Sequence, residues 1–155
     1  MTTHHFHLEA HWPGGRNAVG DIHAGQLQTQ VSIPAAMDGP GVGTNPDEML
    51  LGAAATCYFI TLAAMLERAG IAVETMSQAS DLEVEVDRGQ FACRRITHHP
   101  RVTLARDNPP EAMAKLEQLL HLADKRCMIS NALRGNVELV IEPESGQAQA
   151  NAPAA

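Results

Sequence analysis

One uncharged run, from Met49 to Leu66, constrains the fold of this chain more than any other stretch. Before it, Asn45 is a favourable N-cap residue and Pro46 fits the first helical turn. After it, Gly70 is a typical residue for ending a helix. The sequence therefore predicts a helix of roughly 24 residues, or about 36 Å, between Asn45 and Gly70. Because a helix that is apolar on every face is usually buried on every face, we expect it to be central.

Small side chains surround one thiol in the middle of this predicted helix. Gly52, three alanines and Thr56 precede Cys57 directly. Small residues let other backbones approach closely, so Cys57 is the first residue whose function has to be explained. A purely structural role stays open on these grounds, because free cysteine is among the most buried residue types.

Length and charge limit the class of protein. The chain has 155 residues and a net charge of −7, which predicts one domain over residues 1–143. Residues 144–155 are rich in Gln, Ala and Pro, which predicts a disordered tail. We expect no nucleic-acid partner and no anionic membrane partner, because both need clustered Lys and Arg that the sequence lacks.

The uncharged run also has to be weighed as a membrane span, which needs about 20 apolar residues. It contains Gly, Thr, Cys and five Ala and has no basic flanks, so a buried core helix is favoured. The chain shows no secretion signal, and its three widely spaced cysteines do not form a secreted disulfide framework. We therefore expect a cytoplasmic protein with free thiols.

The N-terminal third predicts short strands. His4 to Trp12 alternates apolar and polar residues, as a half-buried strand does. Asp21 to Ile33 alternates more weakly and predicts two short strands joined by a turn at Gly25. Pro34 to Thr44 is rich in Gly and Pro, which predicts a loop leading into the long helix. A loop in such a place often borders a functional site.

The region after the long helix predicts a β-hairpin. Leu82 to Asp87 alternates apolar with acidic residues, and Arg88 and Gly89 form a predicted turn. The chain then returns through a second strand from Phe91 to Leu104. One face of this hairpin should be wet and the other buried.

Two helical segments and a last strand follow the hairpin. Asn108 is expected to cap a helix that has Pro109 at its first position. The apolar stripe of this helix contains Met113, Leu116, Leu120, Ala123 and, continuing it, Cys127. A helical turn from Met128 to Arg134 and a strand from Val137 to Ile141 complete the chain.

The order of elements predicts an α+β fold with largely antiparallel sheets packed on the long central helix. A helix that is apolar all round has more surface to bury than one small sheet can cover. A second copy of the chain is the simplest additional partner, so we expect a homodimer.

A reactive thiol on the long helix needs a cationic neighbour. An unperturbed cysteine has a pKa near 8.5 and is mostly neutral at about pH 7, and an arginine favours its reactive thiolate form. Arg16, on a Gly-rich turn, and Arg126 are candidates for this arginine. Asp47 and Glu48 are the acids available to orient it. On a continuous helix they lie about 15 and 13.5 Å from the thiol along the axis, so a bridging arginine or a partner chain is needed.

Two long motifs carry a resemblance to a known family. The first motif runs from Thr44 to Cys57 and reads TNPDEMLLGAAATC. The second runs from Cys127 to Val137 and reads CMISNALRGNV. They resemble the two cysteine motifs of the OsmC/Ohr family, and the similarity extends from about Arg16 to Pro143. Members of that family are intertwined α+β dimers that reduce organic hydroperoxides with two cysteines of one chain, in sites at the subunit interface.

The resemblance implies a role for each candidate residue. Cys57 matches the peroxidatic thiol, and Cys127 matches the resolving thiol. Arg16, in Gly-Gly-Arg, matches the arginine of the Ohr branch. The position of the family's catalytic glutamate falls on the shorter Asp47, so either Asp47 holds Arg16 or Glu48 takes its place.

The resemblance also implies the reaction. Cys57 becomes a sulfenic acid, Cys127 condenses with it to a disulfide, and a dithiol reductant reopens the bond. The family points to a lipoyl-bearing protein or another small dithiol as reductant, and to no bound cofactor. An apolar pocket around the thiol favours organic hydroperoxides over hydrogen peroxide.

Two other functions remain open at this stage. A redox sensor would form the same disulfide without turnover. A zinc site from Cys57, Cys127 and histidines is disfavoured, because no close ligand pair such as Cys-x-x-Cys is present. The alternating histidines before Trp12 are expected to be solvated, so no metal is expected. Cys93 has no motif around it and is expected to be structural.

Overall fold

The computed structural model describes residues 1–144 and shows an α+β fold with two three-stranded sheets. The chain divides into two compact units, Met1–Leu50 and Leu51–Ala155. The single domain over residues 1–143 stays a prediction. The predicted tail lies outside the described residues, except for Glu144.

The first unit contains an antiparallel sheet of strands β1 (Glu9–His11), β2 (Gly20–Ala24) and β3 (Leu27–Val31), in that order. The turn between β2 and β3 has Gly25 at a φ of 60°, as predicted for two short strands. The predicted first strand, His4 to Trp12, was too long. β2 offers β1 partners only from Asp21 to His23, so pairing stops at Glu9.

The Gly- and Pro-rich segment is a loop, as predicted, and contains one short 3-10 helix, η1 (Ala35–Met37). Its ends are held together by Ser32, whose hydroxyl donates to the carbonyl of Val42 and accepts from the N–H of Val42, both at 2.8 Å. The loop therefore has a fixed backbone before it enters the long helix.

Helix α1 (Pro46–Arg68) confirms the predicted long helix. The N–H of Glu48 donates to the side-chain oxygen of Asn45 at 2.9 Å, which is the predicted N-cap bond. Beyond the other end, Gly70 takes a φ of 69°.

The expected burial of α1 on every face included a second copy of the chain and stays a prediction. Within the single chain only one face is buried, and it carries Tyr58, Leu62 and Leu66, while Ile60 on the other face is 68% exposed. By length and composition α1 could cross a membrane, but its buried face packs in a protein core. Among residues 51–144, no element covers the apolar face that carries Ile60.

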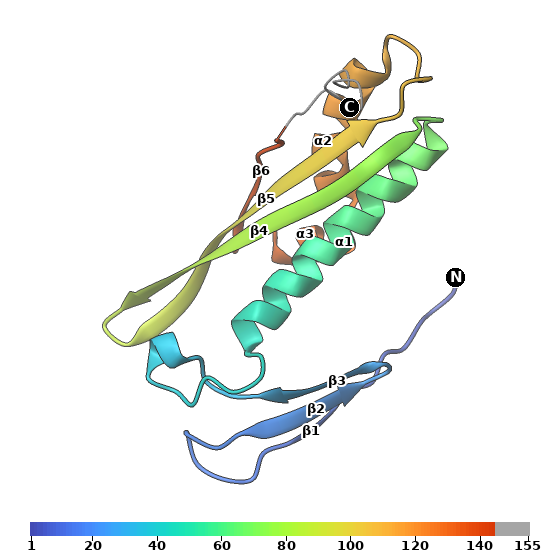
Figure 1. Cartoon of the computed structure of the whole chain (residues 1–155). Coiled ribbons are helices and arrows are strands. Elements are labelled where there is room, and N and C mark those ends of the chain that lie inside the picture. The colour runs from blue at the N-terminus through green and yellow to red at the C-terminus, as the bar shows by residue number, and fades with distance from the viewer. Residues whose placement is uncertain (145–155) are drawn as a thin grey trace, which may run out of the picture. The chain divides into compact units, whose positions relative to one another are not determined.

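The second unit is built on a long hairpin of β4 (Val73–Asp87) and β5 (Gln90–Leu104), shown in Figure 1 as a twisted ribbon with α1 running along it. Its turn residues Arg88 and Gly89 have φ values of 49° and 79°, which confirms the predicted turn. Strand β6 (Glu138–Ile141) adds to β5 in parallel.

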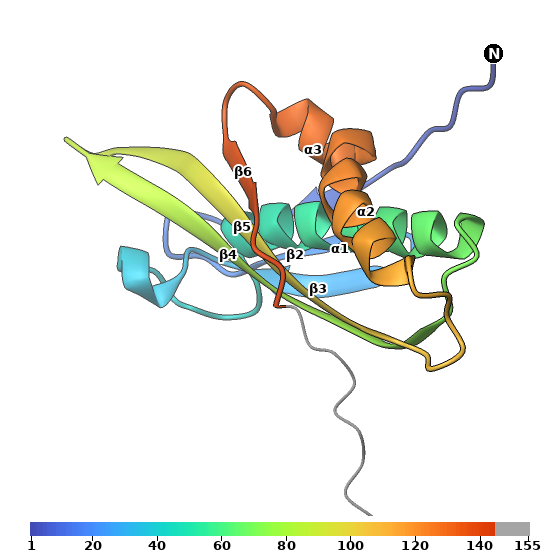
Figure 2. The same cartoon turned by 90° about the horizontal axis from the view of Figure 1, so that it is seen from above.

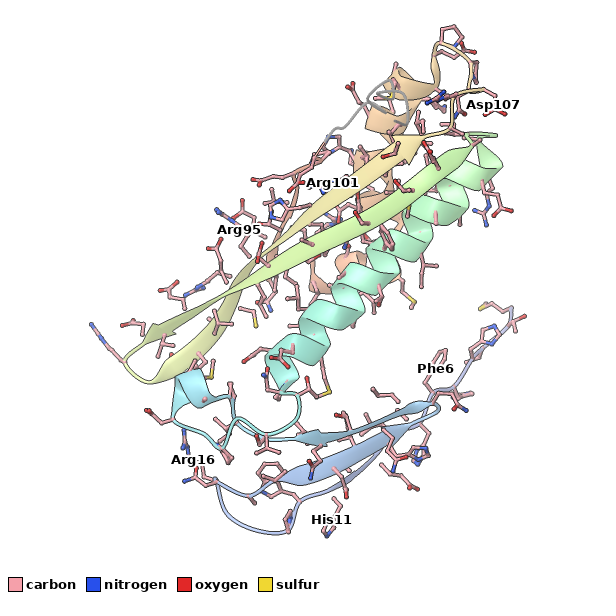
Figure 3. The ribbon with its side chains drawn as sticks, viewed as in Figure 1. Phe6, His11, Arg16, Arg95, Arg101 and Asp107 are labelled. Atoms are coloured by element: carbon pink, nitrogen blue, oxygen red, sulfur yellow. The ribbon has the colours of Figure 1, made fainter. Side chains whose placement is uncertain are left out.

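The sheet has one buried and one wet face, as predicted. Ile96, His98 and Val102 alternate along β5 on the buried face. Arg95 and Arg101 lie on the opposite face, away from α1 (Figure 3), where they pair with Glu138 and Glu144.

Helices α2 (Ala112–Arg126) and α3 (Met128–Leu133) follow one another beside β6 (Figure 2). The prediction that Asn108 caps α2 was wrong. Its side chain instead accepts from the N–H of Ala72 at 2.9 Å and donates to the carbonyl of Ala105 at 2.8 Å. Asn108 therefore ties the end of the hairpin together, and α2 begins later.

Candidate functional site

The second unit brings Cys57 and Cys127 together. Cys127 is fully buried in the main hydrophobic cluster, and Cys57 is a partly buried residue packed against that cluster. Helix α1 supplies Cys57, and the junction between α2 and α3 supplies Cys127. All three cysteines of the chain are free thiols in this structure.

The position of Cys127 follows from its place between two helices. Its N–H donates to the carbonyl of Ala123 at 2.8 Å and so closes α2. Its side chain accepts from the N–H of Ser130 at 3.4 Å and so caps α3. Because Cys127 ends one helix and starts the next, its backbone has little freedom.

The surroundings of the two thiols shift their pKa values in opposite directions. Burial alone would raise the pKa of Cys57. Hydrogen bonding from the Cys127 thiol, the N–H groups of Ile129 and Met128 and the Thr61 side chain outweighs burial, so the pKa of Cys57 is lowered. Burial and the hydrogen bond to Cys57 raise the pKa of Cys127. Cys57 is therefore the thiol that ionises first.

Tyr58, the residue after Cys57, belongs to a buried aromatic pair. Tyr58 stacks on His98, with ring centroids 5.0 Å apart, and its hydroxyl donates to the carbonyl of Leu120 at 3.1 Å. The Nδ1 atom of His98 lies 2.8 Å from the Ser80 hydroxyl. Burial lowers the pKa of His98, and burial together with the charge of Asp124 raises the pKa of Tyr58. This pair links α1, α2 and the hairpin.

Arg16 lies in the first unit, beside the loop that carries η1 (Figure 3). Its guanidinium donates to the carbonyl of Met37 at 2.7 Å and to the carbonyl of Asp38 at 3.1 Å. Glu48 instead accepts from the hydroxyl of Thr44 at 2.8 Å, and Asp47 is half-buried in the first turn of α1. No ion pair between Arg16 and an acid occurs among residues 1–144.

The remaining candidates, Arg126 and Cys93, lie elsewhere in the structure. Arg126 lies in the exposed last turn of α2. Cys93 packs against a smaller cluster with Ala54, Ile96 and Val137 at its centre. Within the part of the chain that the structure describes, no three His, Cys, Asp or Glu side chains are grouped as metal ligands.

Two contributions to the site were missed at the sequence level. Thr61 lies four residues after Cys57 on α1, a spacing that puts both on one helix face and was visible in the sequence. The N–H groups of Met128 and Ile129 had no such signal, because they reach Cys57 only through the tertiary fold.

Comparison with known proteins gives the family of the chain. The family model of OsmC-like proteins matches residues 39–142. The chain belongs to the OsmC-like protein family. Both cysteines of the site lie within the matched residues, as the resemblance of the two motifs predicted.

The chain is similar to two bacterial proteins at different levels of identity. The chain is 54% identical over 142 residues to a Bacillus subtilis protein described as "Uncharacterized protein YmaD", covering 92% of this chain and 95% of that one. It is 26% identical over 136 residues to "Peroxiredoxin OsmC" of Escherichia coli, covering 84% and 91%. The protein is thus related to a peroxiredoxin.

A solved structure has the same fold. An organic hydroperoxide resistance protein OsmC from Legionella pneumophila superimposes with a TM-score of 0.72 at 24% identity, over 92% of this chain and 98% of that chain. At this identity the similarity establishes the OsmC/Ohr fold, and the chemistry has to be argued from the site.

Proposed function

We propose that this OsmC-like protein is a thiol-dependent peroxidase that reduces organic hydroperoxides to alcohols. The observation that carries the proposal is the packing of Cys57 against the cluster that contains the buried Cys127. The lowered pKa of Cys57 and the raised pKa of Cys127 support it. A peroxidatic cysteine must be a thiolate to attack the peroxide. A resolving cysteine must lie close to it and react only after the sulfenic acid has formed.

In the first step the Cys57 thiolate attacks the outer oxygen of the hydroperoxide. A sulfur–oxygen bond forms, the O–O bond breaks, and the alkoxide leaves and takes up a proton to become the alcohol. Two electrons pass from sulfur to the peroxide, and Cys57 becomes a sulfenic acid.

In the second step the sulfur of Cys127 attacks the sulfenic sulfur of Cys57. A disulfide forms, and the departing hydroxide combines with the thiol proton of Cys127 to give water. An external dithiol then reopens the disulfide by two exchange reactions and becomes a disulfide itself. We propose a lipoyl-bearing protein or another small dithiol for this role.

The proposal includes a second copy of the chain. The apolar face of α1 that contains Ile60 is exposed in the single chain, and an exposed apolar face of this kind favours a protein partner. We propose a homodimer in which Arg16 stabilises the developing alkoxide charge and Asp47 or Glu48 orients the guanidinium. We propose that it works in the cytoplasm, where its thiols stay reduced.

The substrate class follows from the surroundings of the thiols. Cys57 packs against the main hydrophobic cluster, whose members include Leu62 of α1 and Leu116 of α2. Contact with apolar groups favours an alkyl or fatty-acid hydroperoxide over hydrogen peroxide.

Steady-state turnover tests the proposal. Cumene hydroperoxide and hydrogen peroxide are supplied with dihydrolipoamide to the wild type, Cys57→Ser and Cys127→Ser, with Cys93→Ser as control. We expect sustained turnover that prefers cumene hydroperoxide and is lost in Cys57→Ser, with a trappable sulfenic acid in Cys127→Ser. Wild-type turnover in Cys57→Ser would overturn the assignment, and oxidation that stops after one equivalent would indicate a sensor.

A further inference from the structure

The turn that carries Cys127 is closed by two side chains, Asn131 of α3 and Arg134 just after α3, that bond back to α2. Arg134 donates from Nη2 to the carboxylate of Asp124 at 2.8 Å and to the carbonyl of Asp124 at 3.4 Å. Asn131 donates to the carbonyl of Lys125 at 3.1 Å. These hydrogen bonds join the two ends of the segment from Asp124 to Arg134, and the turn with Cys127 lies between them.

The Asp124–Arg134 ion pair is partly withdrawn from water. The side chain of Asp124 is 11% exposed and that of Arg134 is 46% exposed. A pair with one nearly buried partner is screened less than a surface pair, and removal of the arginine leaves a buried carboxylate without its cation. The Asp124–Arg134 pair is therefore expected to stabilise its surroundings more than the exposed Arg94–Glu85 pair near the hairpin tip does.

The Asp124 carboxylate also acts on the buried aromatic pair of Tyr58 and His98. Its second carboxylate oxygen, Oδ1, and the Nε2 atom of His98 are both buried and have no hydrogen-bond partner in the described part of the chain. The charge of Asp124 acts on His98 and on Tyr58. Asp124 is thus paired with Arg134, and its charge acts on the aromatic pair.

The closed turn holds the groups that act on Cys57. Cys127 lies in the hydrophobic cluster against which Cys57 and Ile129 both pack. Hydrogen bonding from the Cys127 thiol and from the N–H groups of Met128 and Ile129, all between Asp124 and Arg134 in the chain, lowers the pKa of Cys57 against the effect of burial. A shift of the turn by a few tenths of an ångström would weaken these bonds together, since hydrogen bonds depend steeply on geometry.

We propose that Asp124 and Arg134 are positioning residues whose ion pair fixes the turn that holds Cys127 and Ile129 in the cluster against which Cys57 packs. The part of this inference that concerns turnover rests on the proposed peroxidase function. The part that concerns the ionisation of Cys57 does not depend on it.

The experiment measures the alkylation rate of Cys57 by iodoacetamide against pH, with modification followed on the Cys57 peptide by mass spectrometry. The variants are Arg134→Met, which removes the cation, Asp124→Asn, which removes the charge at nearly constant shape, and Arg134→Lys as the conservative replacement. Arg94→Met is the matched control, because it removes an arginine from an ion pair elsewhere. Circular dichroism shows which variants are folded.

We expect the alkylation profile of Cys57 to move to higher pH in Arg134→Met and in Asp124→Asn, with alkylation at about pH 7 slower by roughly threefold to tenfold. Arg134→Lys should recover part of the loss, and Arg94→Met should match the wild type. If Arg134→Met does not fold, Asp124→Asn decides. An unchanged profile in a folded Asp124→Asn, or an equal shift in Arg94→Met, would overturn the inference.

Peroxide turnover is measured on the same variants. A wild type without turnover, combined with a shifted alkylation profile in Asp124→Asn, would contradict the peroxidase proposal and leave the positioning role standing. Full turnover with no shift in any variant would contradict the positioning role alone.

Discussion

Cys57 packs against the hydrophobic cluster that contains the buried Cys127. Burial raises the pKa of Cys127, whereas hydrogen bonding, chiefly from the Cys127 thiol, outweighs burial at Cys57 and lowers its pKa. The two thiols are therefore chemically unequal before any oxidant arrives. Cys57 has the features of the attacking sulfur, because it is also the more exposed of the two.

The inequality predicts the order of alkylation. Cys57 should react with iodoacetamide before Cys127 at about pH 7, because thiolate is the reactive form. Replacement of Cys127 by Ala removes one donor, so the pKa of Cys57 should rise and its alkylation should slow by about threefold to tenfold. Cys93→Ala is the control and should leave the rate unchanged. Faster alkylation of Cys57 in Cys127→Ala would show that burial by Cys127 outweighs its hydrogen bond.

The exposed face of α1 predicts an effect on assembly. Ile60 is 68% exposed in the single chain, and the proposed second copy would cover it. Ile60→Glu should then shift the protein from dimer to monomer in sedimentation velocity, because an unpaired charge is costly in a buried interface. Val86→Glu, at a residue 55% exposed on the hairpin, should leave the dimer intact. A wild type that sediments as a monomer would contradict the dimer.

Burial within the unit predicts a large effect on stability at Leu62, which is fully buried. Leu62→Ala should lower the free energy of unfolding by about 2–5 kcal/mol, because it removes buried methyl groups and leaves a cavity. Val86→Ala, at an exposed position, should change it by less than about 0.5 kcal/mol. Urea unfolding measures both. A loss at Leu62 no larger than that at Val86 would contradict the core described here.

His98 predicts how stability depends on pH. Burial lowers its pKa in the folded state, so on acidification the unfolded chain binds this proton first, at about pH 6.5. The free energy of unfolding should therefore fall as the pH drops from about 6.5 towards the lower pKa of the folded state. His98→Gln should flatten that slope, while the exposed His121→Gln should keep it. Urea titrations between about pH 5 and 7.5 test this, and an unchanged slope in His98→Gln would count against it.

Much of the fold was predictable because its signals are local. Asn45 caps α1, and Gly25 and Gly89 mark turns whose positive φ values were expected from their residue types. The prediction for Asn108 was wrong, because an asparagine that can cap a helix can equally well bond to backbone groups elsewhere in the fold. The sequence alone does not distinguish the two roles. The burial of one face of α1 could not be read from composition, since composition does not show which neighbours the chain supplies.

The candidate site was only partly predictable, because its two sulfur atoms are neighbours through tertiary contacts. The motifs identified Cys57 and Cys127, but nothing local indicated that the N–H groups after Cys127 would point at Cys57. Asp124 and Arg134 were likewise invisible as a pair, since a ten-residue separation across a turn has no periodic signature. Arg16 was recognised as a turn residue, whereas its bonds to the η1 loop depend on the fold.

The most direct test of the central claim is disulfide mapping after the reduced protein receives one equivalent of cumene hydroperoxide. We predict an intramolecular bond that joins the peptides of Cys57 and Cys127, with Cys93 still alkylatable and the bond reopened by dihydrolipoamide. A protein that consumes the hydroperoxide yet shows no Cys57–Cys127 peptide, or that links Cys93 in its place, would contradict the account.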